Sequence, residues 1–103
     1  MKLKTFFKHE NKWCKNTFAM NKNSQRCNPE SNQAVCFCLL GAAQILKTTP
    51  EDLEKLRIAA TELGIARNSV GLETQMPDVV SLSFTNDSLN WTEFKEWLNK
   101  ANV

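Results

Sequence analysis

The segment that decides the fold is residues 28–46, which read NPESNQAVCFCLLGAAQIL. It begins with a helix-start signal, because Asn28 can cap a helix, Pro29 suits the first helical position and Glu30 favours the helix dipole. Small residues at positions 41–43 would let a neighbouring element approach closely. Apolar side chains recur at helical spacing at Val35, Cys38, Leu39, Ala42, Ile45 and Leu46. The pattern predicts one central helix that is the most buried element.

Shorter elements precede this helix. Apolar spacing predicts a short helix over residues 2–11, with one aromatic face and one lysine face. Residues 12–20 favour an extended segment, and the polar cluster 21–25 has turn chemistry. We therefore expect a small β-hairpin that returns through Arg26 and Cys27.

Clear helix boundaries follow the central helix. Thr49 and Pro50 give a second start signal, and Gly64 ends the helix that begins there. Residues 65–75 have no clear period and indicate a loop, whereas 76–84 fit both a strand and a helix, of which we favour a short helix. A last helix carries an apolar stripe at Phe94, Trp97, Leu98 and Ala101. Its cap is either Asn90 or Thr92.

Length and composition set the fold class. The chain has 103 residues, of which 42% are hydrophobic and 23% charged, with only three Gly and three Pro. Such a chain has room for one domain, and few turn-forming residues disfavour an all-β fold. We predict a single domain over 1–103 of the mainly α (α+β) class. It has four to five short helices around a central helix, and a short β-hairpin between the first and central helices.

The sequence shows no export or membrane signal. The N-terminal residues 1–10 lack the apolar stretch of a signal peptide, and no run reaches the about 18 apolar residues of a membrane span. We expect a cytoplasmic protein with no membrane partner. Its four cysteines are then expected to be reduced thiols rather than disulfides.

Charge is divided unequally along the chain. Residues 1–47 hold eight basic and two acidic side chains, a net charge of +6, whereas residues 48–103 hold five basic and nine acidic ones, a net −4. The basic half suits an acidic protein surface or a phosphate backbone, or complements the acidic half of the same chain. The candidate partner-binding residues are Lys2, Lys4, Lys8, Lys12, Lys15, Lys22 and Arg26.

The cysteines raise two chemical alternatives. The four cysteines and His9 are residue types that bind zinc. However, Cys36 and Cys38, the only close pair, stand at i and i+2 on the expected helix, so their side chains point in different directions. Cys14 with His9 as base, oriented by Asn86 or Asp87, would make a cysteine-dependent hydrolase or transferase. Buried structural thiols are the commoner case. Cys36 lies off the apolar stripe and is the best candidate for an exposed thiol, and Cys38 in mid-helix is a poor nucleophile.

Other catalytic signatures are missing from the sequence. It has no Gly-rich phosphate loop, no His-x-x-x-His pair and no Gly-x-Ser-x-Gly elbow, so we predict neither catalytic residues nor a cofactor or metal. Trp13, Trp91 and Trp97 are not interleaved with basic residues, which favours core packing over base stacking. The pair Asn86 and Asp87 suits a turn before the last helix.

The distribution of motifs resembles one family. Trp13-Cys14, the run Cys38-Leu39-Leu40-Gly41-Ala42 and Asn86-Asp87 before Thr92 resemble a family of small bacterial and phage domains of unknown function. This sequence departs from the pattern where Phe37 and Phe84-Thr85 replace tryptophan. The resemblance implies that five residues gather in one structural cluster, namely Trp13, Cys14, Cys38, Asn86 and Asp87.

These patterns favour a binding function. We expect a non-catalytic bacterial or phage protein that binds another macromolecule, as an inhibitor or adaptor of a host system does. The expected partner is a protein with an acidic surface, met by the basic N-terminal half. A small hydrolase or transferase using Cys14 or Cys38, and a nucleic-acid-binding module using the same basic half, are the alternatives.

Overall fold

Five α-helices, two short 3-10 helices and one antiparallel pair of strands make up the computed structural model, which describes residues 1–103. The α+β class is confirmed, as is a β-hairpin between the first and central helices. The chain divides into two compact units, Met1–Thr48 and Thr49–Val103. That both belong to one domain, 1–103, stays a prediction. The boundary falls one residue from the point at which the charge changes sign along the chain.

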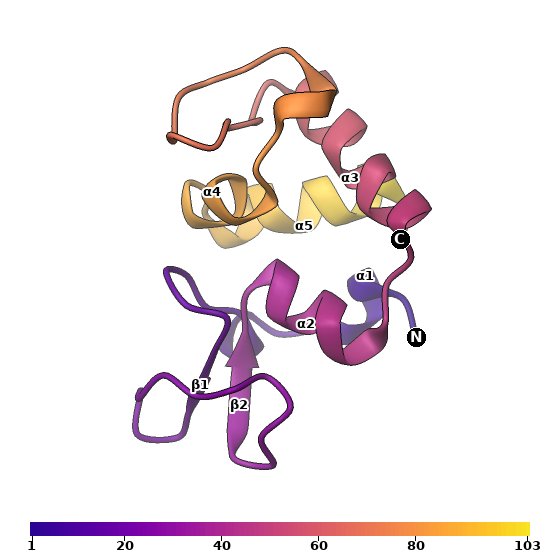
Figure 1. The fold of residues 1–103 in the computed structure, drawn as a ribbon. Helices are drawn as coiled ribbons and strands as arrows, with labels where there is room; N and C mark the ends of the chain where they lie inside the picture. Colours follow the sequence, from indigo (N-terminus) through magenta and orange to yellow (C-terminus); the bar gives the residue numbers. More distant parts are fainter. The chain divides into compact units, whose positions relative to one another are not determined.

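The first unit builds its core around the hairpin and the helix after it (Figure 1). Phe7 is fully buried, and Phe6 packs edge-on against both Phe7 and Phe37, with ring centroids 5.1 and 5.3 Å apart. The first helix ends at Phe6 after one turn, so it is shorter than the helix predicted over 2–11. The elements of the unit are α1 (Leu3–Phe6), the 3-10 helix η1 (Glu10–Lys12), β1 (Ala19–Asn21), β2 (Ala34–Phe37) and α2 (Leu39–Leu46).

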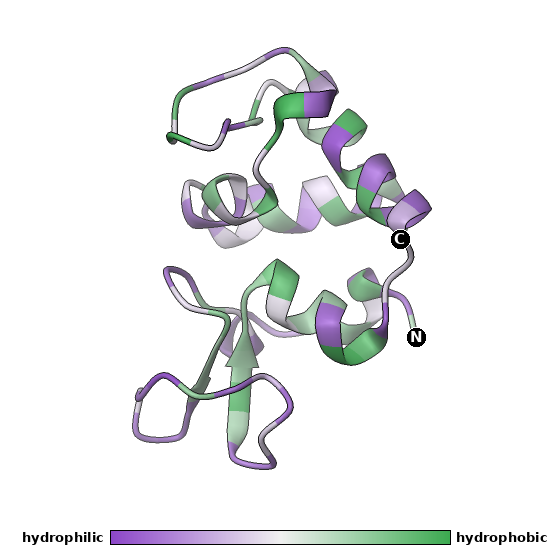
Figure 2. Cartoon of the chain, viewed as in Figure 1, coloured by the Kyte–Doolittle hydropathy of each residue, from purple (hydrophilic) through white to green (hydrophobic).

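The strand β1 pairs on both of its edges. Ala19 lies opposite Phe37 of β2, and the register shifts after Met20. On the other edge, Cys27 donates its amide to the carbonyl of Ala19 at 3.1 Å, and Arg26 bridges to Met20. The predicted return through 26 and 27 is therefore present, but the longer pairing is with β2. Figure 2 shows β2 as apolar and the turn that leads into it as polar.

The central helix begins ten residues later than its sequence signal suggests. The side chain of Asn28 accepts a hydrogen bond from the amide of Glu30 at 2.9 Å, which closes an Asx turn instead of capping a helix. The next residues, Ala34–Phe37, are a strand because the backbone of β1 supplies their partners. The prediction of a helix from 28 onward was wrong, and α2 covers only Leu39–Leu46.

Gly41 allows α2 to approach the hairpin closely. A Cβ atom built at this position would overlap the carbonyl oxygen of Phe18, and it would lie 3.0 Å from the carbonyl carbon. The same carbonyl accepts a hydrogen bond from the amide of Cys38 at 3.1 Å. The expectation that small residues on this helix permit close approach is thus confirmed at Gly41.

The second unit follows its local signals closely. Thr49 accepts a hydrogen bond from the amide of Asp52 at 3.2 Å, and Gly64 ends the helix with φ 72°. Asn90 and Glu93 form a reciprocal capping box at the last helix, so Asn90 and not Thr92 is the cap. The elements are α3 (Pro50–Leu63), the 3-10 helix η2 (Pro77–Val79), α4 (Leu82–Asp87) and α5 (Trp91–Ala101).

The core of the second unit lies between α3 and α5 (Figure 1). The fully buried Trp97 donates its indole N–H to the carbonyl of Leu56 at 2.8 Å and meets Phe94 edge-on at 6.2 Å. The loop between α3 and α4 is held by Thr85, whose hydroxyl accepts the amide of Arg67 at 3.0 Å. None of the helices has the length and apolar character that crossing a membrane requires.

Candidate functional site

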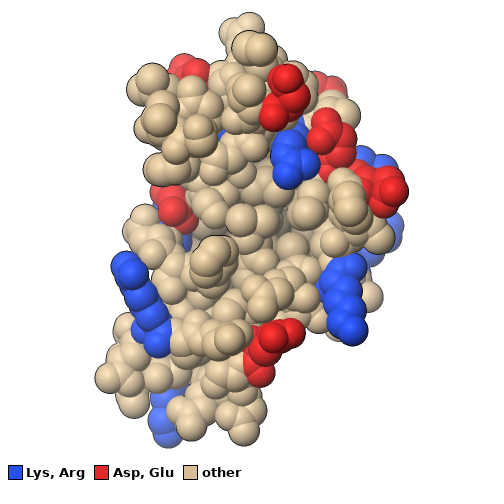
Figure 3. Space-filling model, viewed as in Figure 1, with Lys and Arg blue, Asp and Glu red and all other residues tan.

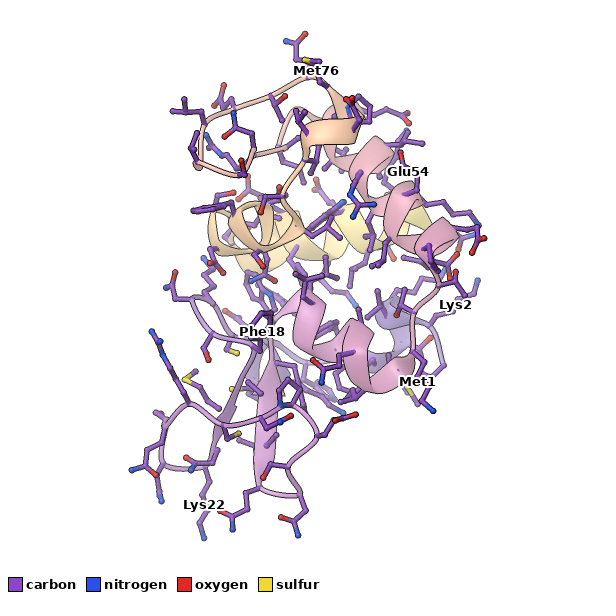
Figure 4. All side chains as sticks on the ribbon, viewed as in Figure 1. Met1, Lys2, Phe18, Lys22, Glu54 and Met76 are labelled. Carbon is purple, nitrogen blue, oxygen red and sulfur yellow. The ribbon has the colours of Figure 1, made fainter.

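The candidate basic residues all lie in the first unit, but they are dispersed over it. Lys2 stands near the N-terminus and Lys22 at the far end of the hairpin, at opposite ends of the unit (Figure 4). Neither forms an ion pair, and Lys8 and Arg26 also have none. On the face shown in Figure 3, acidic side chains predominate over the second unit. The positive charge of the first unit is therefore carried by separate, mostly exposed side chains.

Two of the candidate lysines already have aromatic partners. The ammonium of Lys12 lies 4.0 Å from the ring centroid of Phe6, and that of Lys15 lies 5.1 Å from the ring of Trp13. Both lysines are only partly exposed. Cation–π contacts of this kind hold a lysine stem against the surface. These two side chains support the fold of the N-terminal segment as well as adding charge.

A groove at the hairpin end of the first unit contains Lys22. Its volume is about 340 Å³, and it lies between the turn after β1 and the residues that lead into β2. The exposed side chains of Asn23, Asn32 and Gln33 present amide groups there, and Val35 supplies an apolar wall that is 50% exposed. The complete lining is Asn21, Lys22, Asn23, Asn32, Gln33 and Val35.

The sequence shapes this groove locally. The carboxamide oxygen of Asn21 accepts the amides of Asn23 and Gln25 at 2.9 and 3.1 Å, which fixes the turn that carries Lys22. On the facing side, the hydroxyl of Ser31 accepts the amide of Gln33 at 3.1 Å. Side-chain oxygens at turns thus hold both walls. No carboxylate lines the groove, so its polar groups are carboxamides, which can donate as well as accept, beside one cation.

The five residues of the predicted structural cluster are divided between the units. Trp13, Cys14 and Cys38 belong to the first unit, whereas Asn86 and Asp87 lie in the last turn of α4 in the second. Asn86 is fully buried and donates to the carboxylate of Asp87 at 3.0 Å. The turn expected at these two positions was wrong, because they are helical. Their gathering with the first three residues stays a prediction.

Two expectations about the thiols are corrected. Cys38 is not in mid-helix but is the N-cap of α2, where its Sγ accepts the amide of Gly41 at 3.3 Å. Cys36, expected to be exposed, is only 8% exposed because it lies in β2 rather than on a helix surface. The sequence carried no signal for this cap, because cysteine is not among the residues that commonly cap helices.

The His, Cys, Asp and Glu side chains do not come together as a metal centre. No group of three or more His, Cys, Asp or Glu side chains is placed to hold a metal ion. His9 caps η1 through its backbone and is exposed, and its imidazole forms no hydrogen bond with a thiol. The proposed pairing of His9 with Cys14 therefore has no geometric support.

Sequence reasoning overlooked one further surface, in the second unit. Residues 65–75 were expected to form a loop and 76–84 a short helix, and no surface role was predicted for either. Val70 and Leu72 are 70% and 65% exposed, and Met76 is exposed as well. Beside them lies a cavity of about 490 Å³, lined by Glu54, Arg57, Ser69, Asp78, Val79, Val80 and Ser81. Its position could not be read from the loop alone, because α3 provides one wall.

Comparison with protein families, with curated proteins and with solved structures gave no match.

Proposed function

We propose that this chain is a small non-catalytic bacterial or phage protein that acts by binding an acidic protein, as an inhibitor or adaptor of a host system does. The bound segment of the partner carries carboxylates. It lies in the groove at the hairpin end of the first unit, where Lys22 is the cation and the surrounding amides are the hydrogen-bond donors.

The observation that carries this proposal is the composition of the groove. Lys22, Asn23, Asn32 and Gln33 offer donors on exposed side chains, and no acidic residue lines the groove. A carboxylate accepts hydrogen bonds only, so a wall of amide N–H groups and one ammonium matches its chemistry. Val35 gives the same groove an apolar contact for the carbon atoms of a glutamate side chain.

The charge of the whole first unit adds to this match. A net +6 over residues 1–47 attracts an acidic surface from a distance and raises the association rate. Arg26, which bridges to Met20 beside the turn that carries Lys22, is exposed and without an ion pair. We therefore assign Lys22 and Arg26 to direct contact, and the N-terminal lysines mainly to long-range attraction.

The test uses a fluorescein-labelled octaglutamate peptide, measured by fluorescence anisotropy at low and moderate salt. Binding is expected to weaken with salt. The double variant Lys22→Gln/Arg26→Gln should weaken it about tenfold, since two exposed charge contacts of roughly 0.5–1 kcal/mol each are lost. The matched control, Lys2→Gln/Lys8→Gln, removes the same charge from exposed positions of the same unit and should change binding about twofold at most.

Three outcomes would contradict the proposal. Equal losses in the two double variants would show that net charge, and not the groove, holds the peptide. No measurable binding at low salt would remove the acidic-partner assignment. Tighter binding of a labelled random-sequence DNA duplex, with a steep dependence on salt, would favour the nucleic-acid alternative.

A further inference from the structure

The backbone places two cysteines side by side in the first unit. Trp13 and Phe37 form a parallel bridge, and the amide of Cys14 donates to the carbonyl of Phe37 at 3.0 Å. Residues paired across parallel strands point to the same face, and the next residue on each strand points to the other. Cys14 and Cys38 are those next residues, and both Trp13 and Cys38 have extended backbone angles. The two thiols therefore share one face of neighbouring segments.

The spacing of the two segments suits a disulfide. Paired strands run about 4.7–4.9 Å apart, and disulfides join Cα atoms that are about 4.4–6.8 Å apart. Cys36 lies in β2, two residues before the cap residue Cys38. That is about 6.6 Å along an extended backbone, and Cys36 is therefore diagonal to Cys14. Cys27 pairs with Ala19 on the edge of β1 that faces away from β2. Cys14 with Cys38 is thus the pair that the register favours.

We propose that Cys14 and Cys38 are a dithiol–disulfide pair, a redox-sensitive modification site built into the first unit. The site is independent of the binding groove, since neither cysteine lines it. Its reaction partner is a low-molecular-weight disulfide such as glutathione disulfide, and the corresponding thiol reverses the reaction.

The two sulfur atoms have different surroundings, which assigns their roles. Sγ of Cys38 accepts the amide of Gly41 at the N-terminus of α2, an N–H donor that would stabilise a thiolate formed at this sulfur. Sγ of Cys14 donates to the carbonyl of Thr17 at 3.9 Å, which favours the protonated thiol. Cys38 is therefore the attacking thiolate, and Cys14 resolves the mixed disulfide.

The reaction proceeds in two exchanges. The thiolate of Cys38 attacks one sulfur of glutathione disulfide, and one glutathione leaves as a thiolate. The deprotonated thiol of Cys14 then attacks Sγ of Cys38, and the second glutathione leaves. One disulfide is reduced to two thiols, one protein disulfide forms, and the two cysteine protons pass to the two glutathione molecules. The product joins the segment after η1 to the start of α2 and closes a loop around the whole hairpin.

Both cysteine side chains are less than a tenth exposed, so reagents reach them slowly in the folded protein. The experiment therefore starts from the unfolded chain. The full chain is unfolded, refolded in a glutathione redox buffer, trapped with N-ethylmaleimide and mapped by mass spectrometry. Among the six pairs that four cysteines allow, Cys14–Cys38 is expected to dominate. The effective concentration of the two thiols for each other should be about 100-fold or more higher in the folded chain than in denaturant. The reason is that a fold which holds the two thiols together favours their bond, and the bond in turn stabilises the fold.

Matched variants separate this proposal from a general tendency to oxidise. The Cys14–Cys38 bond should raise the thermal midpoint of the oxidised protein. The variant Cys27→Ser/Cys36→Ser should keep both the bond and this rise. Cys38→Ser places a hydroxyl acceptor at the N-cap, so the protein should still fold. Its thermal midpoint should not respond to oxidised glutathione. A different dominant pair in the wild type, a statistical mixture of pairs, or equal effective concentrations in buffer and denaturant would each overturn the proposal.

Discussion

Replacing Gly41 with alanine tests how closely α2 approaches the hairpin. On an exposed helix the change would be favourable by about 1 kcal/mol, because alanine has the higher helix propensity. In this protein the new Cβ would overlap the carbonyl oxygen of Phe18 and lie 3.0 Å from its carbonyl carbon. Both contacts are to backbone atoms, which have no rotamer by which to move away. We therefore expect Gly41→Ala to destabilise the first unit.

The size of the effect follows from what must shift. Overpacking against a fixed backbone costs about 1–3 kcal/mol. Moving the carbonyl of Phe18 also breaks its 3.1 Å hydrogen bond from the amide of Cys38, and leaving a buried donor unsatisfied costs about 1–3 kcal/mol. After the gain in helix propensity is subtracted, the net loss is about 3 kcal/mol. With a urea m-value of about 1.5 kcal/mol/M, the midpoint falls by about 2 M.

The assay is urea unfolding followed by far-ultraviolet circular dichroism, with hydrogen exchange to locate the weakened amides. The control is Gly64→Ala, where no atom lies within 4 Å of the new Cβ and only the φ of 72° is unfavourable. That change should cost about 1–2 kcal/mol. If Gly41→Ala costs no more than the control, or stabilises the protein, α2 does not pack against the carbonyl of Phe18 as described.

Two further predictions concern the second unit. Trp97→Phe removes the indole N–H and leaves the carbonyl of Leu56 without its 2.8 Å donor, so unfolding in urea should show a loss of about 1–3 kcal/mol, and an unchanged midpoint would contradict that role. Thr85→Val keeps the shape of the buried side chain but removes the acceptor for the amide of Arg67. We expect a loss of about 1–3 kcal/mol in the same assay, with faster amide exchange at Arg67, whereas slower exchange would refute the assignment.

The sequence predicted the second unit better than the first, for a physical reason. The boundaries of α3 and α5 depend on side chains within three or four residues of the helix ends, such as Thr49, Gly64 and Asn90. Short-range hydrogen bonds of this kind are visible in a single sequence. By contrast, the strand β2 exists because β1 supplies its hydrogen-bond partners from thirteen or more residues away. No local pattern contains that information.

The candidate sites divide in the same way. Charge counting placed the net +6 on residues 1–47, and the structure assigns nearly the same residues to one compact unit. The groove beside Lys22 was not predictable, because its two walls come from separate turns. The thiols were misplaced for a related reason, since Cys36 and Cys38 were expected on a helix that begins only after them.

The sequence by itself determined the class of fold, the helices with strong caps, the unequal charge and the run of small residues at 41–43 that allows a close approach. Only the tertiary structure decided whether Asn28 begins a helix or closes a turn, and which segment lies beside Cys38. Local energies favour either conformation by amounts similar to one hydrogen bond, so pairing across the chain decides between them. The groove and the cysteine pair both depend on that pairing.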